Sequence, residues 1–416
     1  MAKKSTSQAN TQQTQPIRWT LMIFMGVSPD VPGFADLSRQ AENSLAEMKK
    51  VVADFVLSPG NTPSPGNRLV NTFVQVHGKT PFRCHLENSS NDEAVPQSEQ
   101  DSESGGALTH FIEWALNTTP HSDEANHRRM LVIWGHAYEF TIDPVETRTG
   151  IDSIDFSEVT KVFEDLQARL KEKYPETDKK LDIVGFDSCD LATIEMSWQL
   201  HRFAHYSLAS QIDEPLPGWP YGDILKGLKD AAELRPMTPS DLGTYIVRQY
   251  CGKYAEHGTA ISLTFLNLER ADDVFKATQQ LAVSLVEATE DPNEIDLAIH
   301  LFFRSQIWLD RPFVDVADLC LNLWRYSSCP QVVEAAGALG DLLVRTSKQG
   351  NAKVQPFVLE HGRNAHSTAR LTGVSLYAPF VAPDFNWPQA SAQYLKFIFA
   401  RETMWGRYVE TLAQAT

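Results

Sequence analysis

Residues 181–200, LDIVGFDSCDLATIEMSWQL, predict a buried strand followed directly by a helix. The stretch opens with an almost continuous apolar run, which is typical of a strand inside a parallel sheet. The run stops at Asp187, and apolar residues at helical spacing begin at Leu191. Cys189 therefore lies between the strand and the helix, where open α/β sheets hold their functional groups. The exposed N–H groups of a helix start would favour its thiolate form.

A second apolar strand, Leu131 to Trp134, places a histidine after its end, with one residue between the strand and His136. Parallel strands end at the same side of a sheet, so we expect this imidazole to lie near the thiol. The histidine precedes the cysteine by 53 residues (189 − 136), close to the roughly 50 found in caspases. A lone buried cysteine is commonly just a small apolar side chain. The pair favours nucleophilic catalysis.

Three motifs resemble the clostripain family of cysteine peptidases, in the caspase clan. They are WGHAY (134–138), GFDSCDLATIEMSWQL (185–200) and LASQIDEPLPGWPY (208–221). The resemblance extends to ALTHFIEWA (107–115) and GVSLYAP (373–379), and covers most of the chain from about residue 19. The chain departs from the family pattern in having Ala137 for a glycine, Ser188 for an alanine, and Leu216-Pro217 where an acidic residue often follows E-P-G.

The fold class follows from element order and from this resemblance. Strands and helices alternate from residue 19 to residue 187, which predicts a doubly wound, mostly parallel α/β sheet with helices on both faces. The resemblance implies a caspase-like sandwich. We expect a disordered tail at 1–17, a catalytic domain at 18–228 with a mobile acidic insertion at 88–106, and a helix-rich α/β region at 229–416 packed on it.

The resemblance also implies a role for each residue of the dyad. Cys189 would attack the peptide carbonyl, and His136 would protonate the departing amine. The backbone N–H groups of Cys189 and Ala137 would hold the oxyanion. Alanine keeps the N–H that glycine would supply, provided that the backbone there does not need a positive φ.

Substrate preference is predicted from the residues around the nucleophile. In the family, an aspartate at the position of Asp187 lies in the S1 pocket and selects Arg or Lys, because a neutral P1 side chain would leave a desolvated carboxylate unpaired. We expect Ser210 and Gln211 to line the same pocket. Asp213, with Glu214, would compensate for the acid missing at Pro217. The simpler alternative for Asp187 is a strand-end cap.

Activation is predicted in the segment that follows the histidine. Residues 141–155 are rich in Asp, Glu, Thr and Gly, which indicates a mobile loop. The loop contains one basic residue, so Arg148–Thr149 is the candidate bond for self-cleavage. The chemistry requires no cofactor and no metal spacing motif is present. Calcium remains an option through four carboxylates that match no known calcium loop, namely Asp143, Glu146, Asp152 and Asp155.

Composition excludes several classes of partner. The net charge of −16 argues against nucleic acid and anionic membranes, and no apolar run approaches the roughly 20 residues of a bilayer span. The N-terminus lacks a signal-peptide core. Five scattered cysteines (84, 189, 251, 320 and 329) without C-x-x-C spacing predict a reducing compartment. We expect a cytoplasmic, bacterial-type protein that acts on protein or peptide substrates. Activation by a partner protein within a protease cascade is an open alternative to self-cleavage.

Two other functions share these motifs. One is a catalytically silent scaffold that binds a partner protein through the same cleft, which the presence of both His136 and Cys189 argues against. The other is an acyl transferase or peptide ligase that uses the same dyad. A Ser-His-Asp hydrolase would need a G-x-S-x-G elbow, and the sequence contains none.

Overall fold

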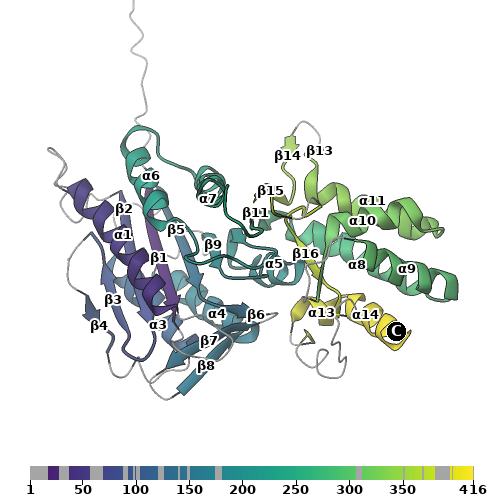
Figure 1. The fold of residues 1–416 in the computed structure, drawn as a ribbon, viewed down its shortest axis with the longest axis horizontal. Coiled ribbons are helices and arrows are strands. Elements are labelled where there is room, and N and C mark those ends of the chain that lie inside the picture. Colours follow the sequence, from purple (N-terminus) through teal and green to yellow (C-terminus); the bar gives the residue numbers. More distant parts are fainter. Residues whose placement is uncertain are drawn as a thin grey trace, which may run out of the picture.

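The computed structural model describes residues 17–27, 37–56, 69–87, 92–96, 99, 104–119, 126–138, 141–147, 150–173, 180–305, 312–349, 352–367, 370–379, 394–395 and 397–415. Its main feature is a nine-stranded sheet in the order β15-β11-β10-β9-β5-β1-β2-β3-β4 (Figure 1). The strands are β1 (Arg18–Gly26), β2 (Val70–His77), β3 (Phe82–His85), β4 (Glu93–Ala94), β5 (His127–Trp134), β9 (Leu181–Asp187), β10 (Ala204–Ala209), β11 (Ser262–Asn267) and β15 (Val358–Arg363). The central strands β2, β1, β5, β9 and β10 are parallel, while the outer strands pair antiparallel. The predicted mostly parallel α/β sheet is confirmed.

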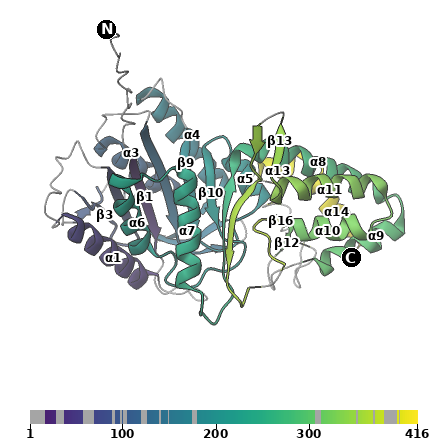
Figure 2. The same ribbon diagram turned by 90° about the horizontal axis from the view of Figure 1, so that it is seen from above.

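Helices cover both faces of this sheet (Figure 2). One face carries α1 (Ser38–Val56), α6 (Tyr221–Leu234) and α7 (Pro239–Lys253), and the other carries α3 (Ser104–Thr118), α4 (Phe156–Lys173) and α5 (Ile194–Leu200). Strand β1 shows why both layers form. Trp19 and Leu21 lie in the core under α1, α6 and α7, whereas Met22 and Phe24 lie in the core under α3, α4 and α5. A strand that is apolar on both sides therefore buries side chains on both faces of the sheet.

The C-terminal helices gather beside the sheet, next to β15 (Figure 1). They are α8 (Ala271–Ala288), α9 (Pro292–Arg304), α10 (Val316–Tyr326), α11 (Pro330–Val344), α13 (Ile398–Glu402) and α14 (Trp405–Ala415), with η3 (Leu268–Arg270) before α8. Two short ladders join them, namely β12 (Phe313–Asp315) with β16 (Ser375–Tyr377), and β13 (Ser347–Gln349) with β14 (Ala352–Val354). The region after residue 228 also supplies β11 and β15 to the main sheet, and the predicted boundary falls inside α6. Within the described ranges, no helix is long and apolar enough to span a bilayer.

Two segments predicted as mobile contain regular structure. Within the acidic insertion at 88–106, β4 pairs with β3, and α3 begins at Ser104. Residues 141–155 form the hairpin of β7 (Thr141–Thr147) and β8 (Gly150–Asp155), joined by β6 (Ala137–Tyr138). The β-branched residues of this stretch favour strands, and Ile154 is fully buried, so the loop prediction gave its acidic residues too much weight. Residues 1–16 of the predicted tail lie outside the described part.

Candidate active site

The ends of β5 and β9 lie side by side in register. Trp134 pairs with Asp187, and the Gly135 N–H donates to the Asp187 carbonyl oxygen at 3.3 Å. His136 and Cys189 each follow this pair by two residues, and both are half-buried. The structure therefore brings the two predicted catalytic residues to the carboxyl ends of neighbouring parallel strands.

The turn that carries Cys189 is fixed by the segment that follows β10. Asp190 adopts a positive φ of 60°, and the Ala192 N–H donates to the Ser210 carbonyl at 2.8 Å. The Glu214 N–H donates to the Cys189 Sγ at 3.3 Å.

The helix start predicted next to the thiol lies farther along the chain. Helix α5 begins at Ile194, with Thr193 as its N-cap. The field of a helix fades beyond its first turn, so the donor that stabilises negative charge on this sulfur is the Glu214 N–H rather than the helix.

Ala137, the predicted second oxyanion donor, is 5% exposed and begins β6. Among the described residues, Asp190 is the single non-glycine with a positive φ, so Ala137 adopts ordinary backbone geometry. Replacement of the family's glycine by alanine therefore causes no backbone strain here. Its N–H as an oxyanion donor stays a prediction.

Asp187 is buried rather than open at the strand end, since only 3% of it is exposed. Its Oδ2 accepts the Trp219 N–H at 2.9 Å and the Tyr221 hydroxyl at 2.8 Å. The Trp219 indole N–H donates to the Glu214 Oε1 at 3.5 Å, so Trp219 contacts both carboxyl groups. Burial raises the pKa of both carboxyls, and the charge of Asp187 raises the pKa of Glu214 further. Asp213, predicted for this role, is exposed instead.

Gly218 lets the chain pass close to Asp187. Its φ is +78°, and a Cβ at this position would lie 2.6 Å from the Asp187 Oδ2. Its carbonyl accepts the Tyr254 hydroxyl at 2.7 Å and the Lys253 ammonium at 3.2 Å. Any larger residue here would push the chain away from the aspartate.

The two other predicted pocket residues make their hydrogen bonds elsewhere. The Ser210 Oγ donates to the Ile212 carbonyl at 2.7 Å. The Gln211 side chain donates to Asp315 at 3.0 Å and to Ser375 at 3.1 Å, and accepts the Gly373 N–H at 2.6 Å. Gln211 thus ties the chain after β10 to β12 and β16. The residue that sequence reasoning undervalued is Glu214.

The remaining cysteines differ from Cys189 in their surroundings. All five cysteines are free thiols. Burial raises the pKa of Cys84 to about 12 and that of Cys251 to about 11, and it also raises the pKa of Cys320. A thiol that stays protonated is a poor nucleophile, so these three fit packing roles.

The predicted activation and calcium residues are only partly described. Arg148 and Thr149 lie outside the described residues, as do the side chains of Asp143, Glu146 and Asp152. Asp155 caps α4, because its Oδ1 accepts the Glu158 N–H at 3.1 Å while Glu158 accepts the Asp155 N–H at 2.9 Å. Among side chains that the structure describes, no group of three or more His, Cys, Asp or Glu could hold a metal ion.

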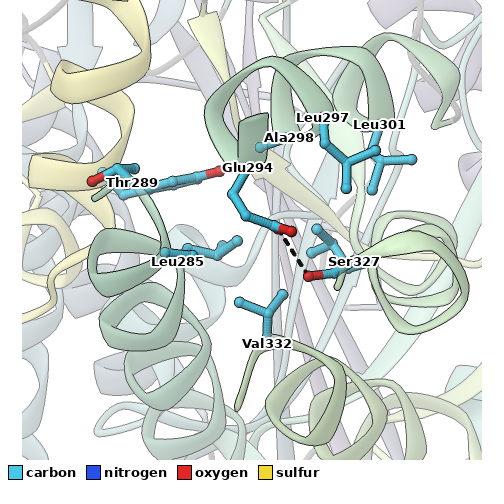
Figure 3. A pocket seen from close by; sticks show the side chains of 11 residues that line it. Leu285, Thr289, Glu294, Leu297, Ala298, Leu301, Ser327 and Val332 are labelled. Carbon is cyan, nitrogen blue, oxygen red and sulfur yellow. Dashed lines mark hydrogen bonds between the residues drawn. The ribbon is translucent and has the colours of Figure 1, made fainter. Parts of the chain in front are cut away.

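A separate small hollow lies among the C-terminal helices (Figure 3). Leucines such as Leu285 and Leu301 line it, and across it the Ser327 hydroxyl donates to Glu294 at 3.1 Å. None of the predicted site residues lines this hollow. It is therefore distinct from the candidate active site.

Comparison with known proteins agrees with this geometry. The profile of the clostripain family, peptidase family C11, matches residues 37–332. A search of curated proteins finds no match. Among solved structures, the chain is similar to an inactive zymogen C11 protease from Parabacteroides distasonis, with 16% identity and a TM-score of 0.59 over 93% of this chain and 97% of that one. It is also similar to a secreted C11 cysteine protease from Bacteroides thetaiotaomicron that was solved with an irreversible peptide inhibitor. The identity is 14% and the TM-score is 0.60, over 94% of this chain and 98% of that one.

These structural likenesses confirm the caspase-like fold, and the profile match spans more than half of the sequence. The chain therefore belongs to the clostripain family of cysteine peptidases.

Proposed function

We propose that this peptidase is an endopeptidase in which Cys189 is the nucleophile and His136 the general acid–base. The observation that carries the proposal is the register of β5 and β9, which aligns Trp134 with Asp187 and so brings both residues to one place. The thiolate attacks the peptide carbonyl, and His136 protonates the leaving amine. Water then hydrolyses the thioester. The Cys189 and Ala137 N–H groups stabilise the oxyanion.

The same proposal includes cleavage after Arg or Lys. Asp187 and Glu214 place two carboxyl groups beside the nucleophile, and the Glu214 backbone contacts its sulfur. A cationic P1 side chain gains a buried acidic partner there, while a neutral one leaves the acid unpaired. This difference favours basic P1 residues.

The test is cleavage of matched fluorogenic peptides that carry Arg, Lys, Leu or Asp at P1. We expect Cys189→Ala and His136→Ala to lower kcat/KM by at least about 10³-fold, because each removes a group required for covalent catalysis. Circular dichroism and urea unfolding should match wild type. Cys251→Ala, which removes a half-buried thiol elsewhere, is the control and should keep its activity.

Different outcomes of this test point to different functions. Full activity in purified Cys189→Ala protein would contradict the dyad. Wild-type protein that binds peptides without cleaving them would favour the silent scaffold. Product peptides joined to an added amine would favour a ligase or transferase.

Activation and location complete the proposal. We infer that the chain cuts itself at Arg148–Thr149, or is switched on by a protein partner in a protease cascade, and that it works in the cytoplasm. Five free cysteines support a reducing compartment, in which a catalytic thiolate persists. Calcium would assist only if the acidic side chains of the β7–β8 hairpin bind it.

A further inference from the structure

Hydrogen bonds hold the turn that contains the nucleophile at Ala192, three residues after Cys189. The Ala192 N–H donates to the Ser210 carbonyl oxygen at 2.8 Å, and the Ala192 carbonyl oxygen accepts the Ser375 N–H, also at 2.8 Å. Thr193 forms a parallel bridge with Ser375, the first residue of β16. Strand β16 lies between α5 and the C-terminal helices (Figure 1). The nucleophile turn is therefore held both by the chain after β10 and by the C-terminal region.

The side chain of Gln211 joins these two supports to each other. It is buried, and its Nε2 donates to the Ser375 Oγ at 3.1 Å and to the Asp315 Oδ2 at 3.0 Å. Gln211 directly follows Ser210, whose carbonyl oxygen accepts the Ala192 N–H. These contacts form a closed ring that runs from the nucleophile turn to β16 and back through the Gln211 side chain.

Asp315 gives this amide a firmly held partner. It is buried at the end of β12 and caps α10, because its Oδ1 accepts the Asp318 N–H at 3.0 Å. It also accepts both the N–H and the hydroxyl of Thr372 at 2.7 Å. The next residue, Gly373, donates its N–H to the Gln211 Oε1 at 2.6 Å. The amide is thus anchored to a point that α10 and the chain before β16 both fix.

The segment that contains Gln211 also reaches the reacting sulfur. Three residues farther along, the Glu214 N–H donates to the Cys189 Sγ at 3.3 Å. Between them, the Ile212 carbonyl oxygen accepts the Asp190 N–H at 3.5 Å. Asp190 has a positive φ of 60°, which a non-glycine residue keeps only where its surroundings fix it. Loss of the Gln211 anchor therefore loosens both the turn and the donor to the sulfur.

We propose that Gln211 is a positioning residue for the peptidase reaction, because its side-chain amide links the C-terminal region to the nucleophile turn and so holds the Cys189 sulfur where it attacks. This inference rests on the proposed function, in which Cys189 is the nucleophile. Gln211 acts through the backbone of Ala192 and Glu214 rather than on the substrate. A displacement of about 1 Å at a reacting atom slows a reaction by about 100-fold, so a distant anchor of this kind affects the rate strongly.

The kinetic experiment measures cleavage of an Arg peptide by variants of the full chain. Gln211→Met keeps the length of the side chain and removes the three hydrogen bonds of its amide. We expect kcat to fall by about 10- to 100-fold while KM changes little, because a displaced nucleophile slows attack more than it weakens binding. Ser375→Ala removes one of the three bonds, so its loss in kcat should be smaller. The double variant should be no slower than Gln211→Met, since the two changes break the same link.

Hydrogen exchange measured by mass spectrometry tests the positioning without any substrate. The amides of Ala192 and Glu214 should exchange at least about tenfold faster in Gln211→Met than in wild type. The matched control is Asn322→Ala, which removes a buried amide of α10 that donates to the Ser305 Oγ at 3.0 Å. This control should lower stability toward urea but leave kcat and both exchange rates unchanged.

The two measurements together separate the possible failures. A folded Gln211→Met protein with the kcat and exchange rates of wild type overturns the role of Gln211. Faster exchange with an unchanged kcat also overturns it, because the link then exists without positioning the sulfur. If Gln211→Met does not fold, Ser375→Ala decides the question by the same criteria. If wild type cleaves no peptide, the proposed function fails, while exchange still shows whether Gln211 holds the turn.

Discussion

Gly218 illustrates how much a single residue determines at this site. With φ at +78°, and Asp187 only 2.6 Å from where a Cβ would stand, it is required by both conformation and space. We expect Gly218→Ala to lower the free energy of unfolding by about 1–2 kcal/mol from the positive φ alone. The added methyl group should also displace Asp187, so the preference for Arg over Leu at P1 should fall.

Urea unfolding and the peptide panel measure both effects. Gly252→Ala is the matched control, because Gly252 lies in α7 and a Cβ there meets no atom within 4 Å. Alanine in a helix is more stable than glycine by up to about 1 kcal/mol, so this control should be neutral or stabilising. A Gly218→Ala protein as stable and as selective as wild type would show that the close approach of Gly218 to Asp187 affects neither stability nor the preference at P1.

Glu195 gives a pH dependence at the same scale. It is fully buried at the start of α5, where its Oε1 accepts the Tyr377 N–H at 3.0 Å and the Tyr394 hydroxyl at 3.1 Å. Burial raises its pKa from 4.5 to about 7. The unfolded chain therefore releases this proton at lower pH than the folded protein does. The destabilisation from Glu195 grows between about pH 4.5 and 7 and is constant above, reaching roughly 3 kcal/mol.

Glu195→Gln tests this dependence, since the amide oxygen keeps both hydrogen bonds and the side chain cannot ionise. The free energy of unfolding of Glu195→Gln relative to wild type should rise by roughly 2.5 kcal/mol between pH 5 and pH 8. Because the comparison is between two pH values, any constant cost of the buried amide cancels. A difference that is the same at both pH values would rule out the raised pKa.

At the scale of elements, strand ends were predictable and side-chain partners were not. Apolar runs locate the ends of β5 and β9 from sequence alone, so His136 and Cys189 follow directly. The roles of Asp213 and Glu214 depend on how the chain after β10 folds back over Asp187, and no local pattern encodes that path. Similarly, Gln211 finds its partners on β12 and β16, about a hundred or more residues away in sequence.

The hairpin of β7 and β8 changes what self-cleavage requires. Thr147 pairs with Gly150 on either side of the candidate bond, so the strands must separate before the segment can enter an active site. We expect slow conversion of purified wild type into two fragments that split after Arg148. Cys189→Ala and Arg148→Ala should remain whole. Mass spectrometry of the fragments identifies the bond, and a wild-type chain that stays intact while cleaving Arg peptides at full rate would contradict the prediction.

Across the whole molecule, the fold class was readable from sequence but the extent of the sheet was not. Regular alternation of strands and helices up to β9 predicts the parallel centre. The strands that complete it, β11 and β15, lie in a region whose composition is mainly helical, and they pair antiparallel. The apolar runs at β11 and near β15 indicate short strands, but local sequence does not show which sheet they join or in which direction, because their pairing partners are distant in sequence.

The pairing of β10 with β11 determines what happens if the C-terminal half is removed. A fragment of residues 18–228 would lose β11, which pairs with Tyr206 to Ala209 of β10. The exposed N–H and C=O groups would form an edge strand flanked by bare apolar surface, a template for joining a second copy. We expect this fragment to form insoluble or large assemblies, whereas residues 18–416 remain dispersed, as size-exclusion chromatography would show. A monomeric, folded fragment would mean that β10 can end the sheet by itself.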